Sequence, residues 1–238
     1  CVDVMVKARA ENMRSGWKSI FSIFGVAAMS IRQDIAQLAF NITKVLRTSK
    51  QSALIQGDFI ELLNCLVVFS GSPHTVIAKE ALEIILQLTD IINEQNAASG
   101  HAEDAIFIFW WPLLLGLSTR VADVRYDVRS KALKILTSIL RTRGQAFNAQ
   151  TWGIVFKGVL FPIVESARTD PEIQPRSAYP AENPQVAKNK ASWVATTGGA
   201  AFDTITSLFS QFLDKGIANL LLGDLLFLLE SFICQEQE

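Results

Sequence analysis

The chain has 238 residues, half of them apolar, and its 22 basic and 23 acidic side chains give a formal net charge of -1. A charge so close to zero argues against nucleic-acid binding, because such proteins need a net basic surface to displace counterions from phosphates. The apolar content excludes an intrinsically disordered chain. The sequence opens on Cys1 with neither an initiator methionine nor a basic leader, so we expect a piece of a longer protein.

The cysteines and the apolar runs indicate the compartment. Cys1, Cys65 and Cys234 are far apart and odd in number, so they form no disulfide framework and indicate a reducing compartment such as the cytosol. The longest apolar run, residues 105–117, contains a proline and falls short of the ~20 residues that cross a bilayer. We therefore expect a cytoplasmic chain whose contact with any membrane is peripheral.

Apolar residues recur with a helical period almost everywhere, and no segment alternates between apolar and polar residues for long enough to form a sheet. Four of the seven prolines fall within residues 170–190, which predicts a proline-rich loop between two helices. The pattern predicts about ten helices, over residues 2–11, 14–29, 33–49, 58–70, 74–95, 102–119, 125–143, 149–168, 191–214 and 217–235.

Three of these helices superpose without gaps when aligned from Asp34, Val76 and Asp127, at spacings of 42 and 51 residues. Helix pairs of the HEAT and armadillo type repeat every ~40–47 residues. A small residue recurs at one aligned position, where it would let a neighbouring helix approach closely. The aligned sets include Ile35, Ile77 and Val128; Ala39, Ala81 and Ala132; Phe40, Leu82 and Leu133; and Leu46, Leu88 and Ile139, with a weaker fourth copy at Ala201, Phe202, Ile205 and Leu208.

These repeats predict an all-α, HEAT/armadillo-like solenoid of about five helix pairs. We expect helical repeats over residues 1–169, the proline-rich loop over 170–190, and a final helix pair over 191–238 that continues the same solenoid. The last helix is apolar over more than half of its circumference, so in a solenoid a following repeat would cover it. The alternative is a fully buried helix in a closed bundle.

Constellations of catalytic residues are missing from the sequence. His74 and His101 lie at predicted helix starts, and neither has a second histidine or a cysteine at metal-ligand spacing. Neither a phosphate-binding GxxxxGK[ST] or GxGxxG loop nor a GxSxG nucleophile elbow occurs. We therefore predict no catalytic residue, no metal site and no cofactor.

Charge is nevertheless uneven along the chain. Residues 118–157 include eight basic residues but only two acidic ones. Lys131, Lys134 and Arg141 point away from the apolar stripe of their helix, which makes them a candidate docking patch for an acidic protein face or an anionic membrane surface. An ordinary solvated helix face is the alternative.

Three further side chains near this patch carry predictions. Arg129 lies close to the apolar stripe, so we expect it to pair with a carboxylate such as that of Asp123 or Asp127. Trp110 and Trp111 follow two phenylalanines directly, so these rings cannot all share one helix face. We predict that both tryptophans pack in the core or between repeats, with an interface anchor as the alternative.

Residues 12–24, NMRSGWKSIFSIF, resemble a stretch downstream of the catalytic domain in the large Arf guanine-nucleotide exchange factors, the Sec-seven and brefeldin A-inhibited group. The resemblance covers nearly the whole chain except the proline-rich loop. The family pattern has phenylalanine where Trp110 or Trp111 stands and cysteine where Gly198 stands, and these departures concern packing. Further similar stretches follow in the same order, at residues 111–114, 127–133, 152–163 and 193–197.

The resemblance implies a regulatory region called homology downstream of Sec-seven (HDS), specifically the second and third such regions. The acidic loop of the catalytic domain does not occur here, so the exchange chemistry would belong to a separate domain. In that family, such helical regions govern membrane recruitment, autoinhibition, homodimerisation and response to small GTPases at the trans-Golgi.

The resemblance thus leads us to expect a non-catalytic regulatory and scaffold segment that acts in vesicle trafficking. Its expected partners are small GTPases, other regions of the parent exchange factor, a second copy of the parent, and an anionic Golgi membrane surface. Two alternatives stay open: a peripheral membrane-binding module that uses the basic helix, and a helical enzyme domain with an unrecognised site.

Overall fold

A computed structural model describes residues 16–49, 59–99, 110–165 and 184–235. All the regular elements among these residues are helical, so the all-α prediction is confirmed for them. The helix predicted over residues 2–11 lies outside the described residues. The chain divides into two compact units, residues 1–116 and 117–238.

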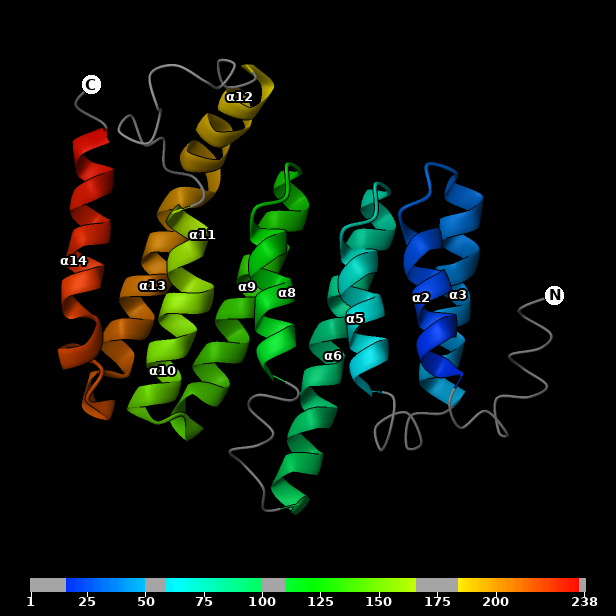
Figure 1. The fold of residues 1–238 in the computed structure, drawn as a ribbon, viewed down its shortest axis with the longest axis horizontal. Helices are drawn as coiled ribbons and strands as arrows, with labels where there is room; N and C mark the ends of the chain where they lie inside the picture. The colour runs from blue at the N-terminus through cyan, green and yellow to red at the C-terminus, as the bar shows by residue number, and fades with distance from the viewer. Residues whose placement is uncertain (1–15, 50–58, 100–109, 166–183, 236–238) are drawn as a thin grey trace. The chain divides into compact units, whose positions relative to one another are not determined.

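Unit 1 contains two helical hairpins (Figure 1). In the first hairpin α2 packs against α3, in the second α5 packs against α6, and α2 also contacts α5. Across the hairpins, the rings of Phe40 and Phe69 lie 5.0 Å apart, and the ammonium group of Lys44 lies 3.0 Å from the carboxylate of Glu80. The helices are α2 (Trp17–Ala28), α3 (Gln33–Ser49), α5 (Phe59–Ser70) and α6 (Thr75–Ser99).

His74 contributes to the packing of unit 1. Its ring nitrogen Nε2 lies 3.0 Å from the carbonyl oxygen of Ser30, so the half-buried ring joins the turn after α2 to the start of α6. The division between the units falls within α8 (Trp111–Val121).

In unit 2, α9 packs against α13, α11 also contacts α13, and α10 contacts α14. Two π-helical turns, η3 (Phe156–Leu160) and η4 (Val194–Gly198), join α10 to α11 and α12 to α13. Two short 3₁₀ turns, η2 (Gly144–Ala146) and η5 (Leu213–Lys215), follow α9 and α13. The α-helices are α9 (Tyr126–Arg143), α10 (Ala149–Val155), α11 (Phe161–Glu165), α12 (Pro184–Trp193), α13 (Gly199–Gln211) and α14 (Ala218–Gln235).

The largest difference from the predicted boundaries lies at α12. The helix was expected to begin at residue 191, but it begins at Pro184, within the segment predicted as a loop. Proline is tolerated in the first turn of a helix, because its missing N–H would have no intrahelical partner there. Residues 166–183 of this region lie outside the described residues.

The aligned helices α3, α6 and α9 bury equivalent positions. The recurring small residue is buried in each, as Ala39, Ala81 and Ala132. One position differs, because Ile35 is 40% exposed whereas its counterparts Ile77 and Val128 are fully buried. The aligned helices therefore share the burial of their small residue as well as that of most of their large apolar residues.

The terminal helix α14 buries only one side. Leu221, Leu225 and Leu228 are buried, whereas Leu226 and Phe227 are 51% and 65% exposed. The fully buried helix expected for a closed bundle is therefore not observed. None of the described helices combines the length and apolarity needed to cross a membrane.

Candidate functional site

The position of α9 beside α13 depends first on a buried arginine. Arg129 is only 2% exposed, yet its guanidinium group makes hydrogen bonds through every nitrogen. Nε donates to Thr197 Oγ1 at 2.8 Å, and Nη2 donates to Thr196 Oγ1 at 2.7 Å. Nη1 donates to the main-chain oxygens of Val124 at 2.9 Å and Asp123 at 3.3 Å. Arg129 thus links the end of α8 to the π turn that precedes α13.

The prediction that Arg129 pairs with the carboxylate of Asp123 or Asp127 is therefore wrong. The carbonyl groups of Asp123 and Val124 lie in the connection between α8 and α9, outside both helices, so they can accept from a buried cation. The carboxylate of Asp123 pairs instead with Arg125, at 2.8 Å between Oδ2 and Nη2. Burial raises the pKa of Asp123, but hydrogen bonds from the side chain and main chain of Arg125 outweigh it and leave the pKa below its usual value.

A buried tryptophan fixes α12 near the same end of the α9–α13 pair. The indole Nε1 of Trp193, at the end of α12, donates to the carbonyl oxygen of Val121 at 2.8 Å. The ring is buried, and its bond satisfies another carbonyl at the C-terminus of α8. Arg129 and Trp193 together hold α12 and η4 against the corner between α8 and α9.

An aromatic cluster fixes the other end. Trp152 is fully buried, its indole Nε1 donates to the carbonyl oxygen of Gly144 at 3.2 Å, and its ring centroid lies 4.6 Å from that of Phe212. A Cβ atom at position 144 would collide with Trp152 and would lie 2.6 Å from Phe212 Cζ. Only glycine fits there, so the end of α9 and the end of α13 meet around one indole ring.

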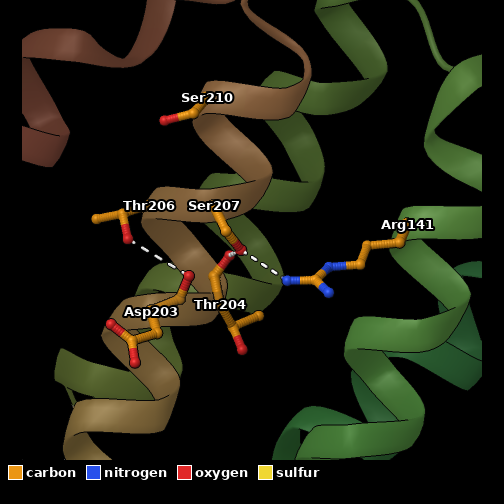
Figure 2. Close-up of a pocket in the computed structure, with 6 residues that line it drawn as sticks. All are labelled: Arg141, Asp203, Thr204, Thr206, Ser207 and Ser210. Atoms are coloured by element: carbon orange, nitrogen blue, oxygen red, sulfur yellow. Dashed lines mark hydrogen bonds between the residues drawn. The ribbon is translucent and has the colours of Figure 1, made fainter.

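Between these two anchored ends lies a shallow groove that we call the α9–α13 groove. It consists of two adjoining hollows of about 400 and 390 Å³ that share Arg141 and Thr204. Figure 2 shows Arg141 extending from α9 toward α13, where Nη2 donates to Ser207 Oγ at 3.1 Å. The lining residues come from α9 (Leu133, Lys134, Thr137, Ser138, Arg141 and Thr142) and α13 (Ala200, Asp203, Thr204, Thr206, Ser207 and Ser210).

Most hydroxyl groups that line the groove already donate a hydrogen bond within the protein. Thr137, Thr206 and Ser207 each donate to a carbonyl oxygen three or four residues earlier in their own helix, at 2.8, 2.9 and 3.1 Å. Thr137 Oγ1 also lies 3.1 Å from Thr204 Oγ1, across the groove floor. The floor is therefore polar but internally satisfied, and covering it leaves few groups without a partner.

Two of the predicted surface residues, Lys134 and Arg141, line this groove and are exposed. Neither forms an ion pair among the described residues. Lys131 is half-buried on the same helix and is not part of the groove lining. Trp110 is buried and Trp111 half-buried, and both belong to unit 1. A role for these five residues in an interaction stays a prediction.

The structure adds hydroxyl groups that the sequence analysis did not single out, chiefly Thr137, Thr204 and Ser207. The available signal was the run of small residues on the exposed face of α13, from Ala200 to Ser210. Among the described residues no group of histidine, cysteine and acidic side chains could hold a metal ion. Burial raises the pKa of the Cys65 thiol to about 12, so that group is not poised for nucleophilic chemistry.

The chain is similar to known proteins over its whole length. A family described as Mon2/Sec7/BIG1-like HDS matches residues 1–45. Across all of its residues the chain is 27% identical to brefeldin A-inhibited guanine nucleotide-exchange protein 1 of Mus musculus, and it covers 13% of that protein. It is 29% identical to protein 3 of the same name in Arabidopsis thaliana, with 98% of this chain and 15% of that protein covered. The chain is thus similar to an HDS region of the brefeldin A-inhibited exchange proteins.

The HDS resemblance predicted from the sequence is thus confirmed by relatives from an animal and a plant. The chain spans only 13% to 15% of the length of these relatives. No solved structure matches the HDS chain.

Proposed function

We propose that this HDS chain is a non-catalytic regulatory and scaffold segment of an Arf guanine-nucleotide exchange factor. The observation that carries the proposal is the similarity of the whole chain to the brefeldin A-inhibited exchange proteins, together with the HDS match at residues 1–45.

The proposed architecture is a HEAT/armadillo-like solenoid that includes the second and third HDS regions. The equivalent burial of α3 and α6 within unit 1, and of α9 within unit 2, supports this arrangement. Stacked helix pairs expose a large surface for their length, which suits a segment that regulates by binding. The proposed division is helical repeats over residues 1–169, a loop that ends where α12 begins at Pro184, and a final helix pair after it.

The proposed partners are small GTPases and other regions of the parent exchange factor, and the parent is proposed to form a homodimer. The proposed place of action is the cytoplasmic surface of the trans-Golgi, in vesicle-mediated protein transport. Regulation of this kind requires that a partner favour one arrangement of the parent protein over another, and it needs no reactive side chain in the segment itself.

Deletion within the full-length protein tests this role. We expect removal of residues 1–238 to change the rate at which the parent releases a fluorescent GDP analogue from Arf, or to change how that rate depends on liposomes. A catalytic domain alone, compared with and without the segment added in trans, separates a direct effect from misfolding of the deletion. Identical rates and identical membrane dependence in all of these comparisons would contradict the proposal.

A membrane-binding module is the second candidate, favoured by one observation: Lys134 and Arg141 are exposed cations without an ion-pair partner among the described residues. Flotation of the chain with anionic liposomes tests it. Replacement of Lys131, Lys134 and Arg141 by glutamate should abolish flotation if this candidate is correct, and flotation that ignores these changes removes it.

A further inference from the structure

We propose that the α9–α13 groove of unit 2 is a docking site for an acidic amphipathic α-helix of a protein partner. The inference rests on the proposed role in protein contacts and names the chemistry of one partner. It follows from the shape of the groove, the charges on its α9 side and the hydrogen bonding of its floor.

The shape of the groove favours a helix. Along its α13 wall the lining side chains are all short, running from Ala200 through Thr204 and Ser207 to Ser210. Short side chains on one helix let a second helix approach to a small interaxial distance. An amphipathic helix that lies in a groove is a common mode of peptide recognition, with contacts repeating every three or four residues.

The charges favour an acidic partner. Lys134 and Arg141 lie seven residues apart on α9, which is about two helical turns, so they line one side of the groove along its length. Within the described part of the chain the guanidinium of Arg141 binds the neutral hydroxyl of Ser207 and no carboxylate, so its charge remains available to a carboxylate. Asp203, on the opposite wall, is the one acidic residue that lines the hollows. A helix carrying carboxylates toward α9 would therefore be complementary.

The hydrogen bonds of the floor favour carboxylates over a phosphate group. A bound phosphate needs several convergent donors. Thr137, Thr206 and Ser207 donate their hydroxyl protons to their own helices, so they cannot donate to a phosphate as well. A helix that lies over this satisfied floor loses few hydrogen bonds to water.

A protein helix also fits better than a membrane surface. Protein segments that bind anionic lipids typically carry clusters of about 4–8 basic residues, often beside apolar side chains that insert into the membrane. The groove lining contains two basic residues, and its exposed wall on α13 carries no large apolar side chain.

A fluorescently labelled helical peptide tests the inference by anisotropy with the purified chain. The peptide has alanine along one face, glutamate on the flank that would face α9 and glutamine on the flank that would face α13, and a scrambled peptide of the same composition spreads these residues over all faces. We expect the patterned peptide to bind more tightly, and K134E/R141E to weaken it roughly tenfold, as two partly exposed ion pairs would. Ala200→Trp should weaken binding to a similar extent by filling the groove without changing its charge.

Matched variants control for charge and for bulk. K18E/K188E reverses two exposed lysines outside the groove lining, and Ala146→Trp adds the same bulk at an exposed alanine; both should bind like the original chain. Equal binding of the two peptides, or no effect of K134E/R141E and Ala200→Trp, overturns the inference. If the chain binds vesicles of phosphatidylserine and phosphatidylcholine but not the peptide, the inference is overturned and the membrane-binding candidate is supported instead. A deletion that still alters nucleotide exchange would leave the proposed function standing in either case.

Discussion

Replacement of Arg129 by methionine should selectively destabilise unit 2. Methionine keeps the length and much of the volume of the buried side chain but removes every donor that Arg129 uses. The hydroxyl of Thr197, which is buried, and the carbonyl of Val124 then lose their partner. A buried acceptor left unsatisfied costs about 1–3 kcal/mol; Thr197 is buried whereas Val124 is 66% exposed, so we expect a loss of about 2 kcal/mol.

Urea unfolding followed by circular dichroism and by hydrogen exchange measures this loss. With a slope of about 2 kcal/mol/M, a loss of about 2 kcal/mol lowers the midpoint of the transition of unit 2 by roughly 1 M. Amides of α9 and α13 should lose protection while those of α2 and α3, in unit 1, keep it. Arg129→Lys should recover part of the stability, because an ammonium group keeps the charge but cannot match the planar fork of donors.

The control is Arg141→Met, on the same helix, where an exposed guanidinium makes a single bond to Ser207. It should change stability by less than about 0.5 kcal/mol. The reasoning about Arg129 would be refuted by a methionine variant as stable as this control, or by equal loss of protection in both units.

Three further outcomes follow from the packing and the pKa values. Gly144→Ala should destabilise by about 1–3 kcal/mol in thermal unfolding, because its Cβ collides with two aromatic rings, whereas Gly153→Ala, which meets nothing within 4 Å, should raise stability by up to about 1 kcal/mol. The pKa of Asp123 is depressed in the folded state, so its pairing with Arg125 stabilises the fold above the usual carboxyl pKa. This stability is lost as pH falls through the lower folded pKa, and unfolding measured from pH 6 to pH 2 should show the loss. Asp123→Asn should abolish this pH dependence. Cys65, with a pKa of about 12, should stay unmodified by a thiol reagent at pH 8 in native protein whose other two cysteines are serine, and should react once urea unfolds the chain.

Helix positions were predictable because the apolar period alone fixes which face of each segment must be buried. The segment predicted over residues 33–49 coincides with α3, and the one over 125–143 differs from α9 by one residue. Two kinds of detail escaped. The π turns η3 and η4 lie inside otherwise continuous apolar patterns, and a single extra residue in a turn leaves no periodic signal in so short a segment. The start of α12 escaped because proline is both a helix breaker and a favourable first residue, and the sequence does not say which role applies.

The candidate groove was predictable only on its α9 side. Lys134 and Arg141 stand out because a basic residue on the polar face of a helix is exposed whichever fold forms. The opposing wall depends on which helix packs against α9, and α13 lies more than 60 residues farther along the chain. Arg129 shows the same limit. Its neighbours in sequence suggested a carboxylate, whereas its partners are hydroxyls of Thr196 and Thr197 and carbonyls at the end of α8.

The partners of Arg129 also bear on why the groove is basic. Arg129 is bound to neutral oxygens, and the carboxylate of Asp123 pairs with Arg125. At the other side of unit 2, Lys157 and Asp224 neutralise each other at 2.9 Å. Among the described residues Lys134 and Arg141 form no ion pair, and Asp203 is the one carboxylate that lines the groove with them, even though the whole chain is nearly neutral. Because desolvating an unpaired surface cation is costly unless a carboxylate replaces the water, this segregation selects acidic partners and disfavours apolar ones.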